Sequence, residues 1–385
     1  MLPDPPPKIS TRLAIVLLLA PFACMADPKI MTAADGDARS FASADAHEAD
    51  APNGLAPCGG PRPVERRWIG ASSPWNDGTA WYPPHPPRSD ESVAISVAAP
   101  GAPRLVAFTS VASLCAPASH PISSDGHTLH IFEYLDAVVL GPGMVLVDGL
   151  RTQIRGMVPG LTVQGVVRLD GDVGVDGDVA IEGRNLLEVG AHRMFVSGGL
   201  RSNGTARLLM KDAGGVVNVR GSVSLAGGAV RGVLTNGTLT VGGDFSVERG
   251  AYRPSEGHSL VLDGREPQRV VLSCEDAACL APPSDEAAFL NHVRVSAPAR
   301  VTLTGGPAFV AKDLIVESGA QLLIDVPAFV AGDLHLAGTL MIAEGARIQI
   351  DGTLRAATTA LRGGAGTIIT ARCEPASSAP AAVCP

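Results

Sequence analysis

Residues 307–314 read Pro-Ala-Phe-Val-Ala-Lys-Asp-Leu, and residues 327–334 read Pro-Ala-Phe-Val-Ala-Gly-Asp-Leu. Seven of the eight positions match, and the two copies begin at Pro307 and Pro327. That offset is too short for a duplicated domain, but it suits one coil of a β-solenoid, in which each coil stacks on the one before. The repeat predicts that Phe309 and Phe329 stack in register, ~4.8 Å apart. We expect both rings to be buried, so that an aspartate at either position would bury an unpaired charge.

Beyond about residue 100 the chain alternates between apolar and other residues. In one stretch the apolar positions are Leu161, Val163, Val167, Leu169, Val173, Val175, Val179 and Ile181. A period of two predicts strands with one buried face. Turn pairs such as Gly198-Gly199 and Asn236-Gly237 separate the strands. Outside the N-terminal segment 1–26, no stretch has the pattern of an amphipathic helix, which excludes doubly wound α/β folds.

Two all-β architectures fit this pattern, a sandwich and a solenoid. A sandwich has no need of a near-identical octapeptide so soon after the first copy. Gly-Asp-Phe at residues 243–245 and Gly-Asp-Leu at 332–334 recur in the same setting, with Lys312-Asp313-Leu314 as a variant. We therefore predict an all-β, right-handed parallel β-helix of about a dozen coils with a small Trp-rich N-terminal cap.

The N-terminus has the features of a secretory signal peptide. Lys8 and Arg12 precede an apolar run at residues 13–20, and small residues follow at Cys24 and Ala26. We expect cleavage after Ala26 and an exported chain, in the periplasm, at the cell surface or outside the cell. Lipidation of Cys24 is the alternative. No later stretch resembles a transmembrane segment.

The predicted organisation has five parts: a signal peptide at residues 1–26, a flexible leader at 27–57, a Trp-rich cap segment at 58–118, a parallel β-helix at 119–372 and a tail at 373–385. Hydrophobic residues make up 46% of the chain and aromatic residues only 4%. The core must then consist mainly of Val, Leu, Ile and Ala. The net charge of −8, with no basic tract, argues against a nucleic-acid partner.

Six cysteines follow the predicted signal peptide, and an even number in an exported chain favours disulfides. Proximity in sequence favours the pairs Cys58–Cys115, Cys274–Cys279 and Cys373–Cys384. A zinc site made of Cys274, Cys279 and His292 is the alternative, although the spacing fits no standard zinc pattern.

All three tryptophans lie within one short segment, at Trp68, Trp75 and Trp81, and Tyr82 and a proline-rich turn follow. Such rings can form a small aromatic core, so we predict that this segment caps the first coil. The alternative is an exposed platform on which sugar rings stack.

The densest group of carboxylates is Asp170, Asp172, Asp176 and Asp178, a weak candidate for binding Ca²⁺. Solvated turn residues are the simpler interpretation. His120, His127 and His130 lie near Asp125 and Glu133, where a solvated loop is again favoured over a metal site. We predict no other cofactor.

The segment with the three tryptophans, Pro87, Asp90 and Val93-Ala94-Ile95 resembles the opening of bacterial secreted or surface β-solenoid proteins, both adhesin-like chains and autotransporter passengers. Residues 237–245 and 257–270 are similar to coils of the same proteins. The resemblance covers about two thirds of the chain and carries no catalytic residue. Autotransporters end in a membrane β-barrel, whereas residues 373–385 here are rich in Ala, Pro and Ser.

These features favour a non-catalytic secreted or cell-surface protein with a structural or adhesive role, whose partner would be an extracellular glycan or surface component. One alternative is a carbohydrate-active β-helix enzyme of the polysaccharide lyase or hydrolase type, which needs charged groups on adjacent coils. Its best patches are Arg265, Glu266 and Arg269, and Glu182 with Arg184. The other alternative is a carbohydrate-binding module that uses the Trp segment.

Overall fold

The computed structural model describes residues 60, 62–71, 73–226, 232–248, 251–273, 290–356 and 366–375, without the side chains of 371–375. All of them belong to one compact unit, Ala51–Pro385. The predicted signal peptide, the Cys24 alternative and the leader lie outside these residues. The described residues form a parallel β-solenoid of about 12 turns, and their one helical segment is the short 3₁₀ turn η1 (Gly78–Ala80).

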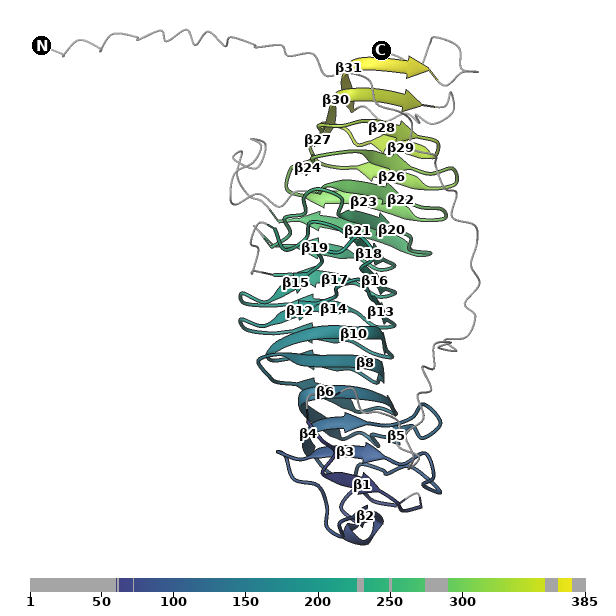
Figure 1. Cartoon of the computed structure of the whole chain (residues 1–385). Helices are drawn as coiled ribbons and strands as arrows, with labels where there is room; N and C mark the ends of the chain where they lie inside the picture. The colour runs from purple at the N-terminus through teal and green to yellow at the C-terminus, as the bar shows by residue number, and fades with distance from the viewer. Residues whose placement is uncertain are drawn as a thin grey trace, which may run out of the picture. The chain divides into compact units, whose positions relative to one another are not determined.

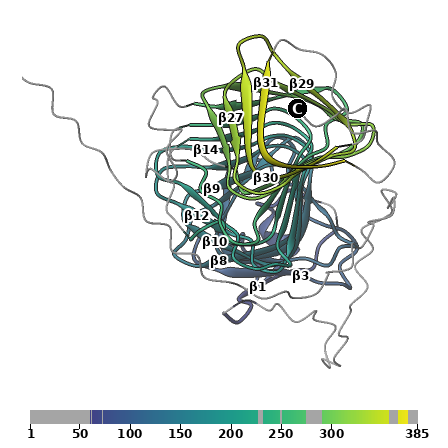
Figure 2. The same ribbon diagram turned by 90° about the horizontal axis from the view of Figure 1, so that it is seen from above.

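The strands of successive coils pair in three ladders, so each coil has three sides (Figures 1 and 2). Ladder 1 contains β1 (Arg66–Trp68), β3 (Ser92–Ile95), β4 (Thr109–Cys115), β6 (Thr128–Leu140), β8 (Thr152–Val158), β10 (Val166–Val175), β12 (Leu186–Glu188), β15 (Arg207–Leu209), β24 (Ala308–Val310), β27 (Ala328–Val330), β30 (Arg347–Ala356) and β31 (Thr367–Pro375).

Several of these strands bend round a corner and continue into another ladder. Ladder 2 adds β5 (Ile122–Ser123), β13 (Arg193–Val196), β16 (Val216–Val219), β18 (Thr238–Val241), β20 (Ser259–Leu262), β22 (His292–Val295), β25 (Leu314–Val316) and β28 (Leu334–Leu336).

Ladder 3 adds β7 (Met144–Val147), β9 (Leu161–Val163), β11 (Val179–Ile181), β14 (Leu200–Ser202), β17 (Val223–Leu225), β19 (Phe245–Val247), β21 (Pro267–Leu272), β23 (Arg300–Gly305), β26 (Gln321–Ile324) and β29 (Thr339–Ile342). Strand β2 (Trp81–Tyr82) differs, because it pairs with β1 in the antiparallel sense.

The register of the ladders confirms the coil length read from the repeat. Leu314 lies beside Leu334, and Leu334 lies beside Leu354, so these two steps along ladder 2 equal the offset between the two octapeptides. The predicted alternation is also confirmed, since the eight apolar residues named above between Leu161 and Ile181 are all buried on β9, β10 or β11. Stacked Val, Leu and Ile side chains therefore form the core.

The predicted stacking of Phe309 on Phe329 is confirmed. The two residues are register partners, and their rings are parallel, with centroids 5.1 Å apart. The expected burial of these rings is wrong. Ala308 and Val310 take the inward positions of β24, so Phe309 points outward and is half-buried. The repeat predicted the spacing of the two rings but not whether they face into or out of the coil.

Ladder 1 is reduced to single bridges in the middle of the stack, where Leu234, Pro254 and Leu290 replace whole strands.

His258 and Tyr252 form a buried polar pair in the interior of this region. Nδ1 of His258 lies 3.0 Å from the carbonyl oxygen of Asn236, and Nε2 lies 3.0 Å from the hydroxyl of Tyr252. A carbonyl can only accept, so Nδ1 donates and Nε2 accepts from the tyrosine. Burial lowers the pKa of His258 to about 4 and keeps the ring neutral.

Candidate binding site at the first coils

The three tryptophans form a buried cluster at the start of the solenoid. The ring of Trp81 lies between the other two, with its centroid 5.0 Å from that of Trp68 and 4.9 Å from that of Trp75, both edge to face. The indole N–H of Trp68 donates to the carbonyl oxygen of Gly101, and that of Trp81 donates to that of Trp75. All three are buried. Their ring faces are therefore not open to a sugar, whereas Tyr82 is exposed.

Strand β2 covers the outer edge of β1. Arg67 pairs with Tyr82 and Trp68 with Trp81, while the other edge of β1 pairs with β3. Prolines follow at positions 83, 84, 86 and 87. Proline has no N–H to donate, so this segment is a poor template for a further strand. The arrangement closes the first edge of ladder 1.

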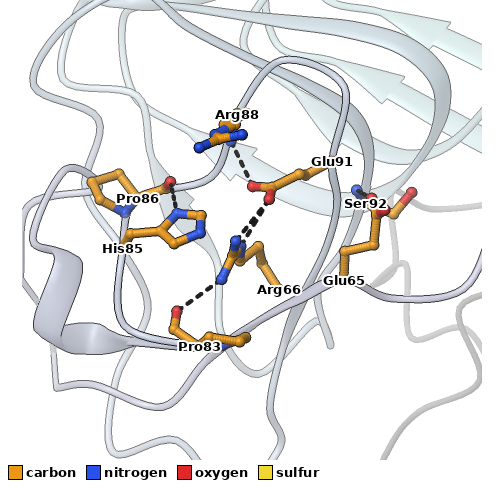
Figure 3. A network of polar contacts seen from close by, with 8 residues as sticks. All are labelled: Glu65, Arg66, Pro83, His85, Pro86, Arg88, Glu91 and Ser92. Atoms are coloured by element: carbon orange, nitrogen blue, oxygen red, sulfur yellow. Dashed lines mark hydrogen bonds and ion pairs between the residues drawn. The ribbon is translucent and has the colours of Figure 1, made fainter.

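A polar network holds the proline-rich turn to the first strands (Figure 3). The guanidinium of Arg66 donates to Oε1 of Glu91 at 2.8 and 3.0 Å and to the carbonyl oxygen of Pro83 at 3.2 Å. The backbone N–H of Arg88 donates to the other oxygen of Glu91. Partial burial alone would raise the pKa of Glu91, but the Arg88 N–H and Arg66 outweigh it and lower that pKa. This charged pair is therefore a structural clamp.

A cavity of about 300 Å³ lies between this turn and the start of β4, and we call it the Phe108 groove. Its apolar walls come from Trp75, Pro86, Pro87, Val106, Ala107 and Phe108. Its polar lining comes from Asn76, Ser89, Thr109 and Ser110. The side chain of Phe108 is 60% exposed.

Aromatic rings continue from Phe108 along the outside of the coil. The Phe108 ring lies 5.9 Å from that of His130, which lies 4.1 Å from that of Phe132. Partial burial lowers the pKa of His130, with Asp148 opposing. His130 therefore packs as a neutral ring at neutral pH.

A second cavity, of about 280 Å³, lies between residues 100–104 and 119–123. His120 borders it, with Nε2 2.9 Å from the carbonyl oxygen of Ala99 and Nδ1 2.9 Å from the hydroxyl of Ser119. Since the carbonyl only accepts, Nε2 carries the proton and Nδ1 accepts from Ser119. His120 thus ties two loops together.

The structure does not bring together the histidines and carboxylates that were weighed as a metal site. Asp125 pairs with Arg104 and Glu133 with Arg62, while His130 packs between phenylalanines. Within the described ranges, no group of three or more His, Cys, Asp or Glu side chains is arranged to hold a metal ion.

The four clustered aspartates have exposed side chains. Two of them bond to the next coil: Asp172 accepts from the backbone N–H of Arg193, and Asp178 accepts from that of Gly199. None of the four aspartates belongs to a metal-binding group in the part of the chain that the structure describes.

Few of the predicted disulfide cysteines can be placed. Cys115 is buried at the end of β4. Cys58, Cys274, Cys279 and Cys384 lie outside the described residues, as does the side chain of Cys373 on β31. The pairing scheme therefore stays a prediction.

One residue of each charged patch considered for catalysis pairs with a neighbouring coil. Arg269 lies 3.2 Å from Asp244, and Glu182 lies 3.5 Å from Arg201. Phe108 and the His258–Tyr252 pair had no sequence signal, because a single aromatic or histidine in an alternating pattern does not show which way it points.

A comparison of the chain with protein-family models, with curated proteins and with solved structures finds no match. No described helix is long and apolar enough to span a bilayer.

Proposed function

We propose that this chain is an exported, non-catalytic β-solenoid with a structural or adhesive role at the cell surface. The observation that carries the proposal is the use of outward polar groups to hold coils together. Asp178, Asp244 and Asp333 each accept a backbone N–H from the next coil. The side-chain pairs Asp136–Arg155 and Arg294–Glu317 also link successive coils. Such a stack is suited to bear load and to display side chains.

Export is supported by the signal-like segment 1–26, and the surface role by the resemblance of residues 68–95 and 237–270 to secreted solenoids. Cells that produce the full chain should carry it where protease added to intact cells can reach it. A variant that lacks residues 2–26 is the matched control and should stay inside the cell. Equal protection of both proteins from protease would contradict a position at the cell surface.

The non-catalytic role is tested with the purified full chain. We expect no release of reducing ends or unsaturated products from a panel of polysaccharides, and we expect cells that display the chain to attach to surfaces better than cells without it. Catalytic turnover of any polysaccharide would refute the non-catalytic role, and unchanged attachment would refute the adhesive role.

A further inference from the structure

The Phe108 groove has the composition of a site for a neutral, amphipathic ligand. None of its lining residues carries a charge. Of the charged residues nearby, Arg66 pairs with Glu91, and Arg88 and Asp90, which flank Ser89, are opposite in sign. A charged ligand would lose its hydration without gaining a counter-charge. An uncharged ligand meets no such cost.

Residues with polar side chains line the groove together with the apolar ones. Among the described residues, no partner hydrogen-bonds the side chains of Asn76, Ser89 or Ser110, and the first two are exposed. An amide and hydroxyls offer both donors and acceptors. They match a ligand that carries several hydroxyl groups.

The ring of Phe108 supplies a flat apolar surface beside these groups. One side of it is supported by His130, and 60% of the side chain is open to solvent. Pro86 and Pro87 form a wall with little freedom to rearrange, so ligand binding would cost little ordering entropy. The volume of about 300 Å³ is at the small end for ligand sites, which suits one sugar ring.

We propose that the Phe108 groove binds one residue of a neutral glycan, with the C–H face of the sugar stacked on Phe108 and its hydroxyls bonded to Asn76 and Ser89. This inference rests on the proposed adhesive function and names its ligand class. A proline-rich peptide also docks on aromatic grooves, but it needs an extended trough. The compact groove and its amide and hydroxyl lining favour the sugar.

The test is binding of the purified full chain to immobilised neutral glycans built of hexoses and N-acetylhexosamines, beside acidic glycans and a proline-rich peptide. Affinities for the retained ligands are measured by calorimetry. Phe108→Ala should weaken binding about tenfold or more, and Phe108→Tyr should retain it. Tyr82→Ala is the matched control, because it removes a similarly exposed aromatic outside the groove and should leave the affinity unchanged.

Four outcomes would overturn the inference: no neutral glycan retained, equal binding by Phe108→Ala, loss of binding in Tyr82→Ala, or preference for acidic glycans or proline-rich peptides. Each leaves the protease-accessibility and attachment results unaffected. Failure of the ligand assignment is thus distinguishable from failure of the proposed function.

Discussion

Phe309 and Phe329 show that the environment of a residue in a solenoid depends on whether its strand position faces into or out of the coil. Both rings lie outside the coil, stacked on each other and half-buried, while Val310 and Val330 on the same strands are buried. A charge placed on the outer position keeps access to water. A charge placed on the inner position does not.

We therefore expect Phe329→Asp to lower the free energy of unfolding by only about 1–2 kcal/mol, mainly through the lost aromatic pair. Val330→Asp, one position further on, should cost several kcal/mol because it buries an unpaired carboxylate. Denaturant midpoints of the two variants, at unchanged m-value, measure the difference. Equal losses would mean that Phe329 faces the core.

His258 is the buried group whose titration should be visible in stability. Its pKa is lowered by burial to about 4 in the folded chain, against an ordinary value near 6.5. The unfolded chain therefore takes up a proton first. The contribution of this group to stability is complete above pH ~6.5 and is lost as the pH falls toward 4.

The loss should reach about 3 kcal/mol at pH 4 relative to a chain without this group. Other carboxylates also titrate in acid, so the measurement is the difference in unfolding free energy between the native chain and His258→Gln from pH 7 to pH 4. The native chain should lose more stability than the variant over this range. Parallel pH profiles would show that His258 is not held neutral.

At the scale of elements, the recurrent Gly-Asp pairs explain how one coil joins the next. A Cβ on Gly332 would lie 2.7 Å from backbone atoms of Lys312 in the coil before, so there is no room for a side chain at position 332. Asp333 N–H donates to Oδ1 of Asp313, and Oδ1 of Asp333 accepts from the N–H of Thr353. The aspartates thus form a chain of bonds that runs along the stack.

Asp333→Ala should lower the free energy of unfolding by about 1–3 kcal/mol, because it leaves the N–H of Thr353 without its acceptor. Asp333→Asn keeps an acceptor oxygen and should recover most of the loss. Asp351→Ala, at an exposed position nearby, is the control. If the asparagine variant were as unstable as the alanine variant, Asp333 would stabilise the chain through its charge and not by accepting the hydrogen bond from Thr353.

The elements also show what could be predicted from sequence. The offset between the octapeptides and the alternation predict the ladders and their buried positions. Equivalent residues of a repeat must lie beside each other in successive coils, and a slip by one residue would turn the apolar side chains outward. The turns between ladders are not predicted in this way. The outward direction of Phe309, the burial of Trp75 and the exposure of Phe108 depend on where the chain turns between ladders, and alternation does not specify those positions.

At the scale of the whole molecule, the six cysteines predicted for the exported chain are proposed to be paired. Thiol titration of the secreted chain, denatured without reduction, should find almost no free thiol, and reduction should reveal six. Several reactive thiols before reduction would contradict the pairing scheme.

The Trp cluster also acts at the scale of the whole molecule, because the segment around it anchors the first coil to later ones. Glu65 and Ser92 exchange two hydrogen bonds of 2.9 Å, and Arg62 pairs with Glu133 on β6. Within the cluster, Trp81 of β2 contacts Trp68 of β1, and this contact holds β2 on the edge of β1. An uncovered edge strand invites pairing with another chain.

We expect deletion of residues 58–96, which removes β1, β2 and β3, to cause aggregation. A finer test is Trp81→Ala, which removes the central ring of the cluster and should cost about 3–5 kcal/mol. It should also loosen β2 and make the chain self-associate in light scattering, whereas the neighbouring Tyr82→Ala should stay monomeric and fully stable, since Tyr82 is 65% exposed. A deletion variant that remained monomeric and stable, yet lost a glycan that the full chain retains, would show that the segment serves in binding and not as a cap.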